Sequence, residues 1–147
     1  MKPPRTCRPA EILCLVVCCA AGCLLNLAGF TRGNEPRNIT ASVNSNVSMS
    51  CAAAWKDVQL SEVTVNCQTD SHEVVHSFRD DEDDLTNQAE RFRGRTEVIH
   101  KDIRNGKASL LLKNIVPNDM GTYHIYFFHH GGYEHCIFHL QVPGMSV

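Results

Sequence analysis

The chain has 147 residues, of which 43% are hydrophobic and 20% are charged, a balance typical of one globular domain and unlike that of a disordered chain. From residue 34 onward it carries 10 Lys and Arg residues against 15 Asp and Glu residues, a net charge of −5. This acidic balance argues against binding to nucleic acid or to an anionic membrane, both of which select a basic protein surface.

Residues 1–33 have the pattern of a secretory signal peptide. Lys2, Arg5 and Arg8 form a basic start, and residues 12–30 contain no charged side chain. A basic start followed by an apolar run is typical of such a peptide. The run also approaches the length of a membrane span, so a retained N-terminal anchor is the alternative. In either case we expect residues 34–147 to form a single domain that is secreted or lies on the external side of the plasma membrane.

The rest of the chain consists of short alternating segments separated by turn residues, the pattern of an antiparallel β-sandwich. We predict strands at 46–51, 62–68, 73–78, 95–99, 108–115, 121–128 and 136–142. We predict a loop at 80–84, a hairpin turn at Asn105-Gly106 and a turn at 129–134.

Two Asn-x-Ser/Thr sequons begin at Asn38 and Asn46. Two sequons behind a signal peptide predict N-linked glycans on a secreted or surface protein. Alternation within residues 46–51 directs Asn46 toward solvent, where a glycan has room.

Asp119, Gly121 and Tyr123 form an Asp-x-Gly-x-Tyr motif, which marks the corner that opens a core strand of an immunoglobulin sandwich. Together with the strand count, the motif predicts an all-β, V-type immunoglobulin β-sandwich of two antiparallel sheets. Arg93 or Arg95 is expected to pair with Asp119 and to hold this end of the sandwich by charge-assisted hydrogen bonds. The residue pattern does not choose between the two arginines.

The region around this corner resembles a known family. The matching residues are Arg93-Gly94-Arg95-Thr96-Glu97, Asp102-Ile103, Gly106-Lys107, Leu110, Asn114 and the corner motif. They are similar to the V-set domains of butyrophilins and myelin oligodendrocyte glycoprotein. The resemblance implies a leukocyte-surface ligand of the butyrophilin-like and T-cell costimulatory ligand group. Such ligands engage receptors on T cells and modulate T-cell receptor signalling and cytokine production.

The chain departs from the family pattern in three ways. Ile125 stands where the family has one cysteine of its central bridge, and Cys67 stands where the family has its core tryptophan. No second immunoglobulin domain and no C-terminal membrane span follow residue 142. We therefore expect membrane attachment only through a retained N-terminal segment or through a C-terminal part missing from this chain.

Three cysteines, Cys51, Cys67 and Cys136, lie beyond the predicted signal peptide. Cys51 keeps its family position without its family partner, and all three have inward parity, so three pairings are open. We slightly favour a relocated bridge between Cys51 and Cys67, with three buried thiols as the alternative. An odd count also leaves one cysteine that would serve a disulfide-linked homodimer.

The last two strands predict a partner-binding face. Its outward side chains are His124, Tyr126, Phe128, His135, Ile137 and His139. An exposed patch of aromatic and aliphatic groups marks an interaction site, although a covering loop or second chain is the alternative. Because imidazoles change charge between pH 5 and 8, pH-dependent binding is a further hypothesis.

We expect no metal, no other cofactor and no enzymatic activity. His135 and His139 lie about 13 Å apart along a strand, too far to share an ion. The acidic run at 80–84 lacks the spacing of a calcium loop. No nucleophile elbow, His-Glu-x-x-His helix or phosphate loop occurs. The sequence thus predicts a module that binds a leukocyte receptor, with a homophilic adhesion or structural module as the alternative.

Overall fold

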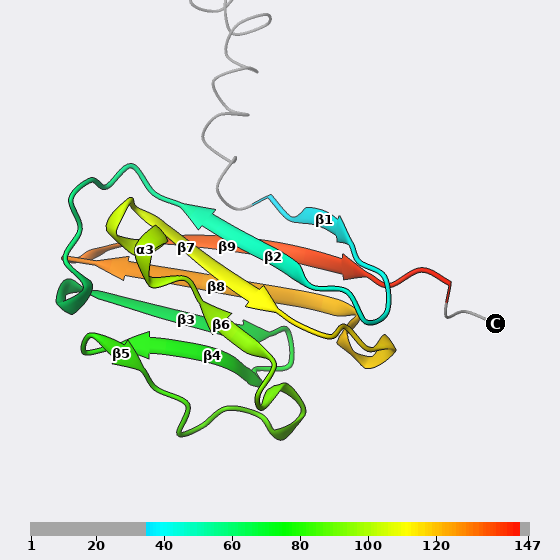
Figure 1. Cartoon of the computed structure of the whole chain (residues 1–147). Coiled ribbons are helices and arrows are strands. Elements are labelled where there is room, and N and C mark those ends of the chain that lie inside the picture. The colour runs from blue at the N-terminus through cyan, green and yellow to red at the C-terminus, as the bar shows by residue number, and fades with distance from the viewer. Residues whose placement is uncertain (1–34, 145–147) are drawn as a thin grey trace, which may run out of the picture. The chain divides into compact units, whose positions relative to one another are not determined.

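The computed structural model describes residues 35–144, which form a sandwich of two β-sheets (Figure 1). The larger sheet has the strand order β1-β9-β8-β3-β4-β5 and the smaller sheet β2-β7-β6. The larger sheet contains β1 (Arg37–Thr40), β3 (Val63–Thr69), β4 (Val74–Arg79), β5 (Glu82–Asp83), β8 (Gly121–His129) and β9 (Gly132–Gln141). The smaller sheet contains β2 (Val47–Ala52), β6 (Thr96–Val98) and β7 (Lys107–Leu112). The predicted all-β V-type sandwich is confirmed, and the predicted signal peptide lies outside the described residues.

Short helical segments connect several strands. They are the 3-10 turns η3 (Leu60–Glu62), η4 (Glu90–Phe92) and η5 (Pro117–Asp119), and the helix α3 (His100–Arg104). The short edge strand β1 was not predicted. It pairs with β9 in parallel, and four residues containing a sequon carry too little alternation to reveal a strand.

Alternation along the strands builds the core between the sheets. Met49 of β2 and Leu110 and Leu112 of β7 are fully buried against Ile125 and Phe127 of β8. Each side chain of this kind stabilises the fold by about 1.5–3 kcal/mol relative to an exposed one. The opposite parity leaves the outer face of the larger sheet to polar and aromatic side chains.

The turn between β8 and β9 is tighter than predicted. His130 and Gly131 both have positive φ, 43° and 78°, and His129 pairs directly with Gly132. Positive φ at both central residues is the geometry of a type I′ turn, which matches the twist of the flanking strands. Consequently β9 begins at Gly132, four residues before the predicted start of this strand.

Two other turn predictions were also incomplete. Asp80 and Asp81 have φ of 52° and 72° and form a two-residue turn into β5, so the acidic run is a hairpin and not a plain loop. Asn105-Gly106 ends helix α3 instead of making a two-residue hairpin. Gly106 has φ of 77°, and a Cβ there would lie 2.2 Å from the backbone oxygen of Trp55, so only glycine fits this helix end.

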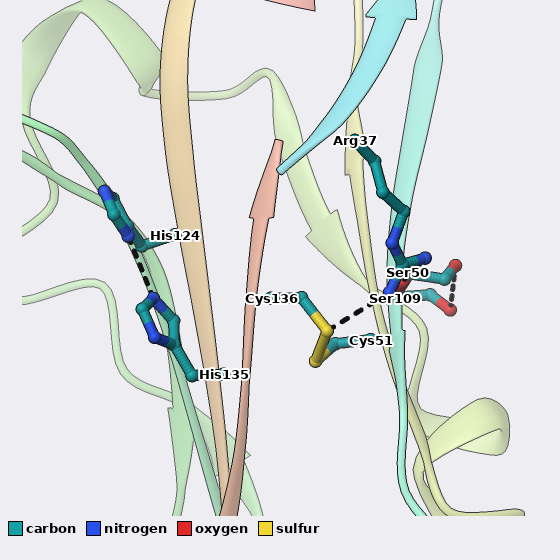
Figure 2. Close-up of a disulfide and its surroundings, with 7 residues drawn as sticks. All are labelled: Arg37, Ser50, Cys51, Ser109, His124, His135 and Cys136. Carbon is teal, nitrogen blue, oxygen red and sulfur yellow. Dashed lines mark hydrogen bonds between the residues drawn. A yellow bond between two sulfur atoms is a disulfide. The ribbon is translucent and has the colours of Figure 1, made fainter. Parts of the chain in front are cut away.

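One disulfide joins the two sheets, between Cys51 of β2 and Cys136 of β9 (Figure 2). The bridge relocated from Cys51 is confirmed, but the slight preference for Cys67 as its partner was wrong. Ile125 pairs with Cys67 on one side and with Cys136 on the other. Cys67 and Cys136 both point inward on either side of Ile125, so the alternation of side chains could not decide which of them pairs with Cys51. Within the larger sheet, β2 packs most closely against β9 and next against β8, which selects Cys136.

Cys67 is the cysteine of residues 35–144 that has no disulfide partner, and it is 1% exposed. Burial raises the pKa of its thiol to about 12, so it neither ionises near neutral pH nor reaches another molecule. The predicted homodimer through an unpaired cysteine is therefore not supported by the described part of the chain. Arg37 lies beside the bridge, where Nη2 donates a hydrogen bond to Cys136 Sγ at 3.3 Å.

The predicted arginine–aspartate pair forms with Arg95 and not with Arg93. Two guanidinium nitrogens of Arg95 donate to the two carboxylate oxygens of Asp119, each at 2.8 Å. The Asp119 side chain is fully buried, and the pair is bidentate, the strongest arrangement of these groups. Arg93 points into solvent with 68% of its side chain exposed.

The rest of the corner also follows the predicted motif. Tyr123 is buried, and its hydroxyl donates to the backbone oxygen of Asp119 at 2.5 Å. Gly121 begins β8 with φ of 148°. The sequence prediction missed Arg91, which donates two hydrogen bonds to Glu73 and lies 3.8 Å from Asp119.

Candidate protein-binding face

The side chains predicted to bind a partner lie on the outer face of the larger sheet. In the β8–β9 register His124 pairs with Ile137, and Tyr126 pairs with His135. Figure 2 shows the imidazoles of His124 and His135 on the side of these strands opposite to the disulfide. The face therefore points away from the smaller sheet.

Five of the rings form a continuous aromatic row across β8 and β9. The aromatic row consists of His124, Tyr126, Phe128, Tyr133 and His135. The Tyr126 and His135 rings stack with centroids 4.3 Å apart and planes 10° apart. Phe128 and Tyr133 are 40% and 59% exposed. Large rings that stay exposed while their neighbours hold them in place suit a binding surface, because little side-chain entropy remains to be lost.

Tyr133 was missed in the sequence prediction because it was placed in a turn. The tight turn at His130-Gly131 brings it into β9, opposite Phe128 and with its ring 5.5 Å from the Phe128 ring. A shorter, two-residue turn at His130-Gly131 would have revealed it, since such a turn fixes the register of the hairpin and places Tyr133 in the second strand.

Ile137 and His139 continue the face toward the β1 edge, where they are half-buried. The Nδ1 atom of His139 lies 2.9 Å from the hydroxyl of Thr122. Asn38 of β1 pairs with His139 and is exposed, so a glycan on Asn38 would stand at this edge of the face. Asn46 is exposed before β2 and accepts a hydrogen bond from a backbone N–H. Glycosylation at both sites stays a prediction.

On the other side of the aromatic row the sheet becomes polar and slightly hollow. A depression of about 250 Å³ lies between β3, β4 and Phe128, and its wall includes Thr64, Asn66 and Arg79. The apolar side chain of Phe128 thus lies next to polar side chains that can form hydrogen bonds, as in protein–protein interfaces, which have an apolar core and a polar rim.

A series of hydrogen bonds lies at the His124 end of the aromatic row. His124 Nε2 lies 2.9 Å from Asp70 Oδ1, and His124 Nδ1 lies 2.9 Å from His135 Nε2. With both imidazoles neutral, His124 donates to Asp70 and accepts from His135, which satisfies every facing atom. Burial and the neighbouring His124 lower the pKa of His135. This arrangement of hydrogen bonds favours the neutral form of His135, because a charged His135 would be partly desolvated and close to the His124 imidazole.

Comparison with known proteins places this geometry in a family. The model of the immunoglobulin V-set domain matches residues 34–143. The chain belongs to the immunoglobulin V-set family. The family expected from the residues around Asp119 is thereby confirmed, and V-set domains of this family are non-enzymatic binding modules of extracellular and cell-surface proteins.

Two curated relatives match this V-set domain, one over a short segment at high identity and one over most of the chain at lower identity. It is 49% identical over 53 residues to V-set domain-containing T-cell activation inhibitor 1 of Rattus norvegicus, an alignment that covers 36% of this chain and 19% of the relative. It is 28% identical over 139 residues to putative butyrophilin subfamily 2 member A3 of Homo sapiens, which covers 95% of this chain and 23% of the relative. The V-set domain therefore spans about a fifth to a quarter of the length of these relatives.

A solved structure agrees with the fold. The human B7-H4 IgV-like domain superposes with a TM-score of 0.65 at 30% identity, covering 70% of this chain and 90% of that chain. Within residues 35–144 of the V-set domain, no helix has the length and apolar character needed to cross a membrane.

Proposed function

We propose that this V-set domain engages a protein receptor on leukocytes, T cells among them, and modulates T-cell receptor signalling and cytokine production. The observation that carries the proposal is the aromatic row, an internally stacked set of rings on the outer sheet face in which Phe128 and Tyr133 are exposed and the others are half-buried. Tyr and Trp rings in such a setting dominate binding energy at protein interfaces. The relatives named for T-cell regulation and the butyrophilins support the choice of receptor class.

The proposed binding is a non-covalent association of two protein surfaces, with no reaction step. Phe128 and Tyr133 would supply the apolar contact, and the polar strip along β3 and β4 would supply hydrogen bonds at its rim. The net charge of −5 beyond residue 33 favours a receptor whose docking surface is neutral or basic.

The direct test is staining of leukocytes with tetramers of the chain produced in animal cells. We expect the parent tetramer to stain resting or activated T cells. Tyr126→Ala and Phe128→Ala should each weaken the staining by at least about tenfold, the typical effect of truncating a central anchor. Leu111→Ala is the matched control, since Leu111 is a half-buried apolar residue on the outer face of the other sheet and should leave the staining unchanged.

The signalling half of the proposal needs a separate readout. T cells stimulated through their receptor on surfaces coated with the chain should release a different amount of cytokine than on surfaces coated with Phe128→Ala. Equal release on both surfaces would contradict modulation of T-cell signalling. Aggregation of beads that carry only this chain, without leukocyte staining, would replace the proposal with homophilic adhesion.

A further inference from the structure

A second group of side chains converges at the end of the sandwich, beyond the aromatic row. Glu62 is the last residue of η3, His129 is the last residue of β8, and His130 begins the turn to β9. Successive side chains of a strand point to opposite faces, but the φ of 43° at His130 breaks this alternation. As a result the two neighbouring imidazoles lie on one side, with ring centroids 4.4 Å apart, and both approach Glu62.

The distances within this group suit a shared ion. His130 Nε2 lies 3.0 Å from one carboxylate oxygen of Glu62, and His129 Nε2 lies 3.6 Å from the other. One ligand atom from each residue fits within 4.8 Å of the other two. In a tetrahedral zinc site with bonds of about 2.0–2.2 Å, neighbouring ligand atoms are separated by about 3.4 Å, which is close to these spacings.

One nitrogen in the group has no partner within hydrogen-bonding distance. Among residues 35–144, His129 Nε2 is the buried side-chain polar atom that makes no hydrogen bond, although it faces the Glu62 carboxylate. A buried polar atom without a partner is costly in a folded protein and calls for an explanation. The ion pair between Glu62 and His130 satisfies those two residues, but His129 Nε2 stays 3.6 Å from the second carboxylate oxygen, too far for a hydrogen bond. A bound metal ion would occupy all three ligand atoms at once.

We propose that Glu62, His129 and His130 form a zinc-binding site at the end of the V-set domain. Two imidazoles and one carboxylate are ligands that Zn²⁺ prefers, and a set of three leaves a fourth position for water or for a side chain of a partner. The ion would tie the β8–β9 turn to the segment that enters β3. It would thereby hold the end of the aromatic row next to Phe128 in place. The sequence pointed only to His135 with His139 and to the acidic run at 80–84 as metal candidates. The Glu62 group could not be found from it, because the convergence of these side chains depends on the left-handed backbone of His130.

The chain contains a built-in reporter for this site. Trp55 is its single tryptophan, and its ring centroid lies 5.1 Å from that of His129. The experiment is a calorimetric titration of the untagged chain from animal cells with Zn²⁺ alone, in parallel with Trp55 emission. We expect one Zn²⁺ per chain, an emission change that saturates with the same curve, and a higher melting temperature in zinc, because a ligand of the native state stabilises it.

Variants decide whether these residues hold the ion. His130→Asn and Glu62→Gln should each weaken zinc binding by at least about tenfold, as loss of a group at a metal site typically does. His72→Asn is the matched control, since His72 is an exposed histidine with φ of 70° in another turn, and asparagine tolerates this backbone. It should bind zinc like the parent.

Three results would overturn the proposal. The first is no heat and no emission change up to about 1 mM Zn²⁺, which corresponds to an affinity too weak for a specific site. The second is parental zinc binding in His130→Asn. The third is loss of binding in His135→Asn with retention in His130→Asn, which would place the ion at the imidazole pair on the aromatic row. Since no receptor is present, these results are independent of the leukocyte experiment.

Discussion

At the scale of single residues, the chemistry of the aromatic row depends on which groups carry protons. Asp70, His124 and His135 form one hydrogen-bonded chain, and Tyr126 stacks on His135. Protonation of His135 places a positive charge under the Tyr126 ring and beside a second imidazole. The same atoms that shape the proposed contact therefore link it to pH.

Folding stability should fall as the pH falls through the range in which His135 titrates. Burial first, and the charge of His124 second, lower the folded-state pKa of His135 below its ordinary value of 6.5. Between the two pKa values the unfolded chain binds more protons than the folded one, so stability is full above the unfolded value and is lost toward the lower folded value. Urea midpoints at pH 7.5, 6.5 and 5.5 measure the slope.

His135→Asn should lose less stability over this pH range than the parent. His139→Asn is the comparison variant, because His139 lies on the same face and is hydrogen-bonded to Thr122 instead of to His124. An identical slope in the parent and in His135→Asn would assign the pH dependence to other groups.

The corner at Asp119 offers a second prediction at this scale, because it separates two arginines that the sequence left equivalent. Arg95→Ala removes the two guanidinium hydrogen bonds to the fully buried Asp119 carboxylate and leaves the one from the Val116 backbone N–H. It should destabilise the fold by about 3 kcal/mol, the lower end for a broken buried pair. Arg91, at 3.8 Å from Asp119, offsets part of the loss. Arg93→Ala should stay within about 0.5 kcal/mol, as for other exposed sites. Chemical denaturation of both variants measures the contrast, and equal losses would contradict the assignment.

At the scale of strands, the domain keeps a covalent link between its sheets but attaches it to β9 instead of β8. Ile125 fills the position left on β8 and is fully buried. Cys136 lies beside it in the next strand, so the linkage is displaced by one strand spacing, about 4.8 Å.

Removing this link should have a large effect, and removing the buried thiol a small one. Cys136→Ser should cost about 2–5 kcal/mol, the usual cost of losing a native disulfide from a small secreted domain. In that variant a reducing agent should no longer change the melting temperature. Cys67→Ala should keep the response to reduction, because Cys67 is not in the bridge. A parental response to reduction in Cys136→Ser would mean that Cys51 is bridged to another residue.

At the scale of the whole molecule, the sequence predicts a processed and glycosylated product. Intact mass after expression in animal cells should show a chain that starts near Asn34 and becomes lighter on deglycosylation. Thr40→Ala and Ser48→Ala should each remove one glycan, because each destroys one sequon. Recovery of the chain only from membranes, with Met1 retained, would instead indicate the N-terminal anchor.

Much of the fold could be predicted because strand alternation and the Asp119 corner are local patterns. Strand alternation identified the inward parity of the three cysteines beyond the signal peptide and the outward rings of Tyr126 and Phe128. The bridge could not be predicted, since Cys67 and Cys136 have the same parity on either side of β8 and only the position of β2 separates them. Tyr133 and the convergence of Glu62, His129 and His130 were missed for one shared reason. Both depend on the left-handed backbone of His130, and a non-glycine residue rarely adopts this conformation, so the sequence gives little sign of it.

The position of the disulfide also determines how this domain responds to mechanical force. A pull between the two ends of the described chain reaches Cys51 from one side and Cys136 from the other, and these residues are 85 positions apart. The loop between them cannot be drawn out while the bridge is intact, so only the residues before Cys51, which include β1 and most of β2, and the part of β9 after Cys136 can be peeled away. In the family arrangement, with the bridge on the preceding strand, the whole last strand could be stripped from the sheet. Here most of the proposed binding face lies within the covalently closed loop and would keep its shape when a bound cell pulls on it.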